Sequence, residues 1–340
     1  MKIRLPLILA TALLAGNVHR DWNRFPAVAQ SDANQDIYVV GDVHADYQRL
    51  VRVLAAAGVI AINPPDPKHP EWIAGRATVV FMGDLIDKGP RALDVLDFVQ
   101  ALRDRATASG GQVFSLLGNH EAEFLADPAK RKSREFAEEL KRRGLNPADV
   151  AACHTEIGIF LCSEPFALRL RDWFFSHGGD THGRTLARLS ADLQAGVDAA
   201  GFATAELIGD DSILEARLGE KGEGGRPWVE SGPGHDARTL LRSYTAALGV
   251  KHIVQAHQHA AIVFSDGVRR KKGQMFQRDG LLFLVDTGMS EGVNDSDGAV
   301  MRIRQEPAEE AIAICADGSR TKIWDAQTSP AIGASKVCGR

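Results

Sequence analysis

The chain has few cysteines and, beyond its first residues, no long apolar run. Its four cysteines among 340 residues form no CxxC pair, which argues against a zinc-type cysteine array. No later segment reaches the roughly 18 uninterrupted apolar residues of a membrane-spanning helix. The sequence also shows no internal repeat and no low-complexity tract. Its apolar fraction of 44% and charged fraction of 25% are those of a soluble globular protein.

The chain also lacks an excess of charge of one sign. Lys plus Arg is 40 and Asp plus Glu is 44, which gives a net charge of −4. The basic stretch at residues 130–134 is followed at once by acids and is typical of a solvated helix face. We therefore expect no nucleic-acid partner.

The N-terminus has the pattern of a secretory signal. Lys2 and Arg4 precede an apolar stretch over residues 5–15, and residues 27–29 form an A-x-A cleavage site. We therefore predict a signal peptide over residues 1–29 and an exported, periplasmic or secreted protein. The charged and bulky residues 19–24 fit this pattern less well, so a cytoplasmic enzyme with an N-terminal extension is the alternative.

The four cysteines allow two disulfides. In an oxidising compartment Cys153 could pair with Cys162, and Cys315 with Cys338. The other interpretation is four free thiols, because the sequence alone does not establish the pairing.

From residue 36 the chain alternates strand patterns with helix patterns. Short apolar runs predict strands at residues 37–40, 78–82, 113–117, 173–176, 252–255 and 281–285. Amphipathic spacing predicts helices over residues 47–57 and from Pro90 to Leu102. This alternation predicts an α/β layered fold, in which ligands gather outside the carboxyl ends of the strands.

Three segments depart from that plan. Residues 122–170 are helical in pattern, charged and rich in Arg and Glu, which predicts a helical insert or cap. Residues 219–234 hold six glycines and two prolines, which predicts a loop. Residues 306–340 are assigned to a C-terminal tail, because the last twenty lack clear periodicity.

Five short polar motifs directly follow apolar runs. They are GDVH (41–44), GDLID (83–87), GNHE (118–121), HGG (177–179) and HQH (257–259). A hydrophobic core has no use for so many Asp, Asn and His side chains at strand ends. They are the residue types that hold two divalent metals side by side.

The residue types specify a chemistry for this site. Asp42 and His44 are two apart, so in extended chain both reach one metal. Asp84 has two oxygens and can bridge two cations, while Asn119 and the histidines of the later motifs add neutral ligands. This set suits manganese, iron, zinc or cobalt. Two such ions can share a bridging hydroxide that attacks phosphorus in line. His120 is placed to protonate the leaving group, held by Asp87.

These motifs resemble the calcineurin-like metallophosphoesterases, and within them the phosphoprotein phosphatase family, in particular its Shewanella-like branch. That family's pattern is GDxHG, GDxxDRG, GNHE, HGG and a late AH. This chain has GDVHA (41–45), GDLIDKG (83–89), GNHE, SHGG (176–179) and QAHQH (255–259). The helical insert and the stretch VDTGMS (285–290) support the Shewanella-like branch. The resemblance covers about residues 36 to 305 and implies a layered α-β-β-α sandwich with a helical insert.

The resemblance implies a role for each matching residue. Asp42 and His44 bind the first metal and Asp84 bridges. The second metal is bound by Asn119, His177 and His257. His120 is the proton donor with Asp87 as its partner. His259 matches the GHxH of the wider superfamily, where the second histidine reaches the first metal, and a role outside the metal site is the alternative.

Three departures concern phosphate binding. Lys88 replaces the phosphate-binding arginine of GDxxDRG, which keeps the charge but loses the bidentate fork. The second phosphate-binding arginine is not evident; Arg226 is the candidate, and a surface arginine in a glycine-rich loop is the alternative. Ala45 replaces a motif glycine, and the stretch after Asp286 lacks the family's tyrosine.

The resulting hypothesis is a dinuclear-metal phosphomonoesterase. We expect two divalent or trivalent ions (manganese, iron or zinc), a bridging hydroxide as nucleophile, and a phosphorylated Ser, Thr or Tyr of a protein as substrate. A hydrolase of small phosphoesters or dinucleoside polyphosphates is one alternative. The other is a binding module that holds phosphate without catalysis.

Overall fold

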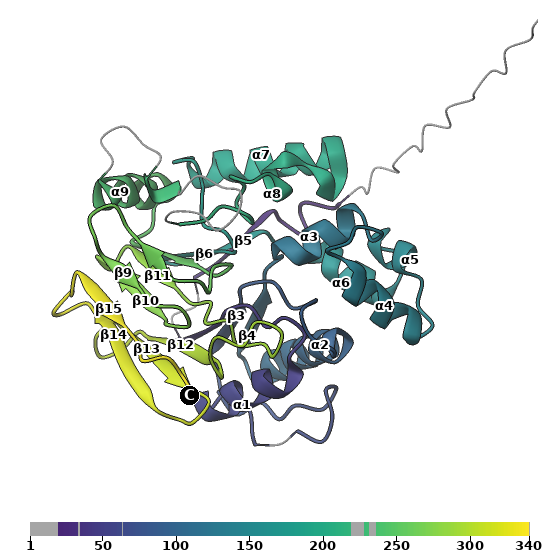
Figure 1. Ribbon diagram of the computed structural model, residues 1–340, viewed down its shortest axis with the longest axis horizontal. Coiled ribbons are helices and arrows are strands. Elements are labelled where there is room, and N and C mark those ends of the chain that lie inside the picture. Colours follow the sequence, from purple (N-terminus) through teal and green to yellow (C-terminus); the bar gives the residue numbers. More distant parts are fainter. Residues whose placement is uncertain (1–19, 33–34, 63, 219–227, 231–235, 340) are drawn as a thin grey trace, which may run out of the picture.

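Two β-sheets pack face to face in the computed structural model, which describes residues 20–32, 35–62, 64–218, 228–230 and 236–339 (Figure 1). The six-stranded sheet has the order β14-β13-β12-β2-β3-β4. Its strands are β2 (Ile37–Val40), β3 (Thr78–Phe81), β4 (Gln112–Ser115), β12 (Ala299–Arg304), β13 (Glu310–Cys315) and β14 (Arg320–Asp325). Strands β2, β3 and β4 run parallel, so their carboxyl ends lie at one edge.

The seven-stranded sheet has the order β1-β5-β6-β7-β11-β10-β15. Its strands are β1 (Val28–Ser31), β5 (Ala167–Leu170), β6 (Trp173–Ser176), β7 (His252–Gln255), β10 (Phe276–Arg278), β11 (Leu282–Leu284) and β15 (Ile332–Ala334). Strands β6, β7 and β11 are parallel neighbours. A separate two-stranded ribbon pairs β8 (Ile262–Val263) with β9 (Arg269–Arg270).

Alternate residues of the central strands face different layers. In β2, Ile37 and Val39 join the core between the two sheets, whereas Tyr38 and Val40 join the core under the helices. All four are buried, as expected for a strand covered on both faces. The continuous apolar runs of the sequence reflect this double burial.

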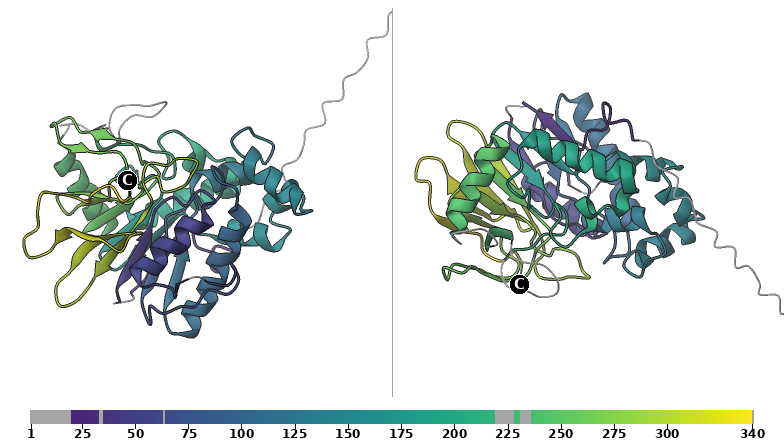
Figure 2. Two further views of the ribbon diagram at one scale, coloured as in Figure 1. Left: turned by 60° about the horizontal axis from the view of Figure 1, so that its bottom comes forward. Right: turned by 90° about the horizontal axis from the view of Figure 1, so that it is seen from above.

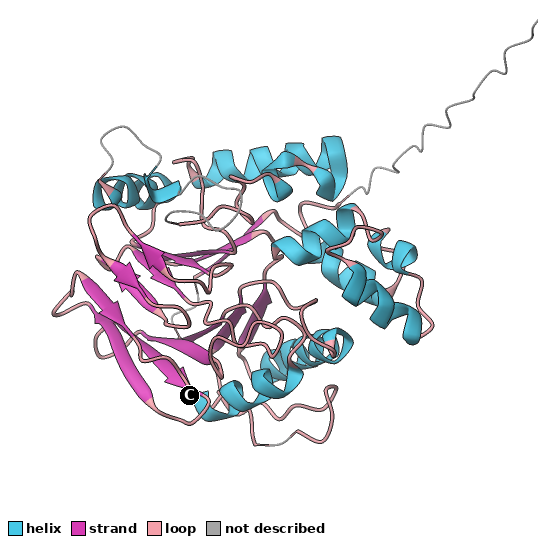
Figure 3. Cartoon of the chain, in the orientation of Figure 1, coloured by secondary structure: helices cyan, strands magenta, loops and turns pink. Residues whose placement is uncertain are grey.

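Helices cover the outer faces of both sheets (Figures 1 and 3). α1 (Tyr47–Ala57) and α2 (Ala92–Ala108) lie on the six-stranded sheet, where α1 contacts β12 and β13 and α2 contacts β4. On the other side lie α7 (Leu186–Ala200), α8 (Ala205–Ile208) and α9 (Ala237–Leu248). The predicted α-β-β-α layering is therefore confirmed. No helix among the described residues is long and apolar enough to cross a bilayer.

Four further helices gather at one end of the sandwich (Figure 2). They are α3 (Asn119–Ala126), α4 (Arg134–Arg142), α5 (Pro147–Ala151) and α6 (Glu156–Ser163). The Cys153–Cys162 disulfide ties the end of α5 to α6. The segment predicted as a helical insert ends in strand β5, whose short, mixed sequence ALRL gave no clear strand signal.

The chain after residue 305 is not a separate tail. Strands β13 and β14 extend the six-stranded sheet, β15 pairs with β10 of the other sheet, and the Cys315–Cys338 disulfide joins β13 to the segment after β15. Charged residues such as Arg320 and Lys322 interrupt the apolar pattern of these outer strands. Because of this composition, hydrophobic periodicity did not predict these strands.

The predicted cleavage site also lies inside the folded domain. Ala27 is buried, and β1 pairs in parallel with β5 from Val28 to Ser31, so a cut after Ala29 would split this strand. Small residues satisfy an A-x-A pattern, and they equally suit a closely packed strand. Residues 1–19 lie outside the described part of the chain.

Candidate metal centre

The predicted ligands converge where strands of both sheets end. Asp42 and His44 follow β2, Asp84 follows β3, His177 follows β6 and His257 follows β7. The backbone of three of them has positive φ, at 47° for His44, 50° for Asp84 and 63° for His257. Non-glycine residues seldom adopt this conformation, and such strain concentrates at functional sites.

Asp84 is shared by two groups of potential ligand atoms. Its Oδ2 lies 3.6 Å from His44 Nε2, which is also 3.6 Å from Asp42 Oδ2. Its Oδ1 lies 3.4 Å from His177 Nε2. His257 belongs to this second group, with ligand atoms of all three residues within 4.8 Å of one another. Asn119 Oδ1 lies 3.1 Å from His177 Nε2 and completes it.

These distances fit cations held between the side chains. Nitrogen and oxygen ligands bind transition metals at about 2.0–2.2 Å, so two ligand atoms on one ion lie about 3–4 Å apart. His257 Nε2 is buried and has no hydrogen-bond partner among the described residues, as expected for an atom that awaits a metal. The Nδ1 atoms of His44 and His177 contact the carbonyls of Ile86 and Met82, which orients each Nε2 toward the site.

Burial and charge shape the titration of these groups. Burial lowers the pKa values of His44 and His257 well below the usual range, so both imidazoles are neutral and able to bind a metal. Burial and the nearby Asp286 raise the pKa of Asp42. Burial opposes ionisation of Asp84, but the His177 and His120 charges hold its pKa well below the usual value.

His120 stands beside the shared aspartate. Its Nδ1 is 2.9 Å from Asp87 Oδ2, and its Nε2 is 4.0 Å from Asp84 Oδ2. Asp87 in turn accepts a 3.1 Å hydrogen bond from the Phe136 backbone N–H of α4. Burial would lower the pKa of His120, but Asp84 and the Asp87 hydrogen bond raise it above the usual value. His120 therefore keeps its proton to higher pH than a free imidazole, and its Nε2 lies on the side of Asp84.

Lys88 reaches into the same centre. Its Nζ lies 3.0 Å from His44 Nε2, while its backbone N–H donates to Glu135 of α4.

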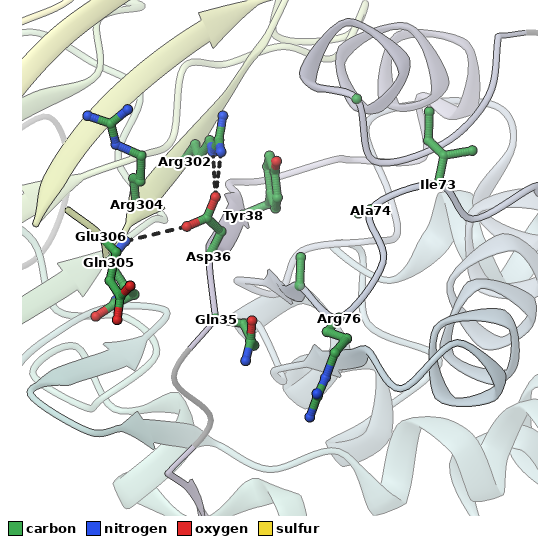
Figure 4. Close-up of a pocket in the computed structure, with 12 residues that line it drawn as sticks. Gln35, Asp36, Tyr38, Ile73, Ala74, Arg76, Arg302, Arg304, Gln305 and Glu306 are labelled. Carbon is green, nitrogen blue, oxygen red and sulfur yellow. Dashed lines mark hydrogen bonds and ion pairs between the residues drawn. The ribbon is translucent and has the colours of Figure 1, made fainter. Parts of the chain in front are cut away.

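A cavity of about 500 Å³ adjoins Lys88, lined by residues of α4 and of the loop after β11, including Glu138, Arg142 and Glu291. A cavity of about 680 Å³ lies at the opposite ends of β2 and β12, where Asp36 pairs with Arg302 (Figure 4). The second cavity is lined by no motif residue, whereas the first is lined by Lys88 and Gly89 of the GDLIDKG motif.

One predicted site residue among those the structure describes, His259, is not brought into this geometry. His259 Nδ1 is 2.5 Å from Asp295 Oδ2, and His259 belongs to neither group of ligand atoms. This contact with Asp295 agrees with the alternative given for His259 above, a role outside the metal site. Arg226 lies outside the described residues.

Three residues in the centre were missed or left without a role. Glu121 accepts hydrogen bonds from the backbone N–H groups of Gly118, Asp84, Leu85 and Ile86, which fixes the loop that carries Asp84. Glu215 accepts a 2.9 Å hydrogen bond from Asn119 Nδ2. Arg217 lies near enough that its charge contributes to the low pKa of His257. Glu215 and Arg217 alternate with the buried apolar residues Leu214, Ala216 and Leu218, and this alternation is the signal that the sequence offered.

The family comparison matches most of the chain. The model of the calcineurin-like phosphoesterase family matches residues 36–261, which confirms the resemblance inferred from the motifs. Among solved structures, the cold-active protein-tyrosine phosphatase of the psychrophile Shewanella sp. has a TM-score of 0.63 at 19% identity. That match covers 87% of this chain and 82% of the other. At this identity the likeness supports the fold.

Curated relatives match over shorter stretches. Shewanella-like protein phosphatase 2 of Arabidopsis thaliana is 31% identical over 85 residues, which cover 25% of this chain and 20% of that protein. The symmetrical bis(5'-nucleosyl)-tetraphosphatase of Enterobacter sp. is 35% identical over 89 residues, which cover 26% and 24%. The chain thus spans about a fifth to a quarter of the length of these relatives.

Proposed function

The chain belongs to the calcineurin-like phosphoesterase family, and from this premise we propose that it is a metal-dependent phosphatase acting on phosphorylated Ser, Thr or Tyr side chains. The observation that carries the proposal is the pair of side-chain groups that share Asp84. His44 and His120 lie with it in one group, and His177 and His257 in the other, while Asp87 contacts His120. Asp42 and His44 would hold one ion, and Asn119, His177 and His257 the other, with Asp84 common to both.

Each residue of this chain has a task around the ions. Two metals held by these residues would supply an activated water and neutralise phosphate charge. His120 carries a proton on Nε2 and delivers it to the leaving oxygen, while Asp87 holds Nδ1 and keeps the imidazole oriented. Lys88 contacts His44, and the charge of Arg217 acts on His257; we assign these two cationic side chains to phosphate binding.

The substrate class rests on the setting of the site. The cavity beside Lys88 is open to the surface between α4 and the loop after β11, which suits a phosphorylated side chain presented by a larger molecule. The likeness to Shewanella-like protein phosphatase 2 supports this class. The likeness to the symmetrical tetraphosphatase favours the second candidate, a hydrolase of dinucleoside polyphosphates.

A substrate panel separates these functions. Purified protein would be analysed for its metals and assayed on phosphopeptides, p-nitrophenyl phosphate and dinucleoside tetraphosphates. We expect metal-dependent turnover of phosphopeptides that Asp84→Asn abolishes. Activity on the tetraphosphates alone would select the second candidate, and a metal-loaded but inactive wild-type protein would indicate a binding module.

A further inference from the structure

Glu215 is a carboxylate of the centre, 13% exposed, to which neither the motifs nor the proposed mechanism gives a role. Its backbone is fixed from two sides, because Gly178 of the HGG motif donates a 2.7 Å hydrogen bond to Ile213 and the Glu215 N–H donates to Ser212 Oγ. The neighbouring Leu214 and Ala216 are fully buried. The backbone that carries this carboxylate is therefore fixed by hydrogen bonds and by the burial of its neighbours.

The two oxygens of Glu215 face different partners. Oε1 accepts the 2.9 Å hydrogen bond from Asn119 Nδ2, which leaves Asn119 Oδ1 turned toward His177 Nε2. Oε2 lies 3.8 Å from His257 Nε2. That distance is too long for a hydrogen bond, and it is the spacing of two ligand atoms that share an ion.

His257 supplies an independent observation. Its side chain is 3% exposed, and its Nε2 has no hydrogen-bond partner among the described residues. A buried nitrogen without a hydrogen-bond partner destabilises the folded state unless a ligand binds it. The cation that His257 awaits would therefore lie next to Glu215 Oε2 as well.

The neighbouring lysine does not take up this oxygen. Lys132 Nζ lies 2.6 Å from Glu123 Oε1 and 3.9 Å from Glu215 Oε1, so its short contact is with Glu123. Both contacts leave Glu215 Oε2 facing His257.

We propose that Glu215 is an additional protein ligand of the second metal ion, binding through Oε2 while Oε1 orients Asn119. This inference rests on the proposed dinuclear centre and adds a negatively charged oxygen to a site otherwise made of Asp84, one amide and two imidazoles. Carboxylate oxygen favours manganese over the softer ions, so the second site should prefer manganese to zinc more strongly with Glu215 than without it.

Glu215→Gln tests the ligand role directly. Glutamine keeps a carbonyl oxygen for Asn119 but replaces the other oxygen with an amide nitrogen that cannot bind a metal. Manganese binding to metal-free protein would be measured by calorimetry, and the dinuclear manganese signal by electron paramagnetic resonance. We expect the second ion to bind at least about tenfold more weakly, with the first ion little changed. The preference for manganese over zinc should fall as well.

Glu123→Gln is the matched control, because it changes a neighbouring carboxylate that pairs with Lys132 and should leave both affinities unchanged. Wild-type affinity for both ions in Glu215→Gln overturns the inference. So does a loss seen only in Glu215→Ala, which would limit Glu215 to orienting Asn119. Wild-type protein that fails to bind two ions would instead overturn the dinuclear centre itself. Circular dichroism spectra that match the wild type confirm that each variant is folded.

Discussion

At the scale of single residues, Asp84 joins the two halves of the centre. Each of its oxygens faces a different histidine, and its left-handed backbone turns the side chain inward at the end of β3. Glu121 stabilises this conformation through its hydrogen bonds to the Asp84, Leu85 and Ile86 N–H groups. These hydrogen bonds fix the loop, so the protein itself sets the position of the Asp84 carboxylate.

His120→Asn should slow alkyl phosphates more than aryl phosphates while both metals stay bound. The reason is that a poor leaving group needs the proton most, and general acids contribute about 10²–10⁴-fold. The raised pKa of His120 keeps that proton to higher pH, so wild-type turnover of alkyl phosphates should fall as pH rises through this pKa. The variant should lack this alkaline decline. Equal slowing of both substrate types, measured as kcat with metal content checked, would remove His120 from this role.

Lys88→Arg should tighten phosphate binding. An arginine fork adds one charge-assisted hydrogen bond worth about 1 kcal/mol, so the inhibition constant for inorganic phosphate should fall about fivefold. Lys88→Met, which lacks the charge, should raise it. An inhibition constant unchanged in both variants would show that Lys88 does not contact phosphate.

At the scale of elements, the candidate ligands follow the ends of strands, and helix α4 contacts the residues beside them. The carboxyl ends of β2, β3, β6 and β7 deliver ligands from both sheets to one edge of the sandwich. Helix α4 then fixes Asp87 through the Phe136 N–H and Lys88 through Glu135. The helical insert thus contacts the proton-donor pair as well as the cavity beside it.

The N-terminal segment is an element whose removal we expect to destabilise the fold. Arg20 is buried and donates to the carbonyls of Phe25, Pro26, Cys162, Ser163 and Glu164. Arg20→Ala should lower the free energy of unfolding by about 2–4 kcal/mol, because several buried carbonyls lose a charged donor. Urea denaturation would measure the change. Lys322→Ala, at an exposed side chain, is the control and should change it by less than about 0.5 kcal/mol.

The structure of the same segment changes the position at which we expect signal-peptide cleavage. If the protein is exported, we expect cleavage upstream of Arg20, because a cut after Ala29 removes Arg20 and divides β1. Mass spectrometry of the exported protein would give its first residue. A chain that begins at Gln30 and is as stable as one that begins at Arg20 would contradict this expectation.

At the scale of the whole molecule, the centre concentrates negative charge between the sheets. Asp42, Asp84, Glu121 and Asp286 are all at most 3% exposed. Metal removal should therefore destabilise the protein. Ions at one hundred times their Kd stabilise the folded state by about 2.7 kcal/mol each, so a chelator should lower Tm and added manganese should restore it. Calorimetry of Asp84→Asn provides the control, since its Tm should respond less to both; a wild-type Tm insensitive to chelator would contradict the prediction.

The sequence by itself determined the central strands, the helices that follow them and the candidate ligands that the structure brings together. Doubly buried strands need unbroken apolar runs, and metal ligands are drawn from few residue types, so both leave local patterns that a single sequence displays. Ile37–Val40 and Tyr47–Ala57 have the bounds that their periodicity indicated.

Only the tertiary structure decided what depends on contacts distant in sequence. Strands β1, β5 and β13 to β15 are short or interrupted by charge, and pairing with other strands makes them strands. Glu215 and Arg217 belong to no motif. They lie near Asn119 and His257 because their segment accepts a hydrogen bond from Gly178 at Ile213. His259 matched a pattern, but Asp295, 36 residues later, holds it elsewhere. Local sequence encodes which groups are available, whereas packing of distant segments decides which of them meet.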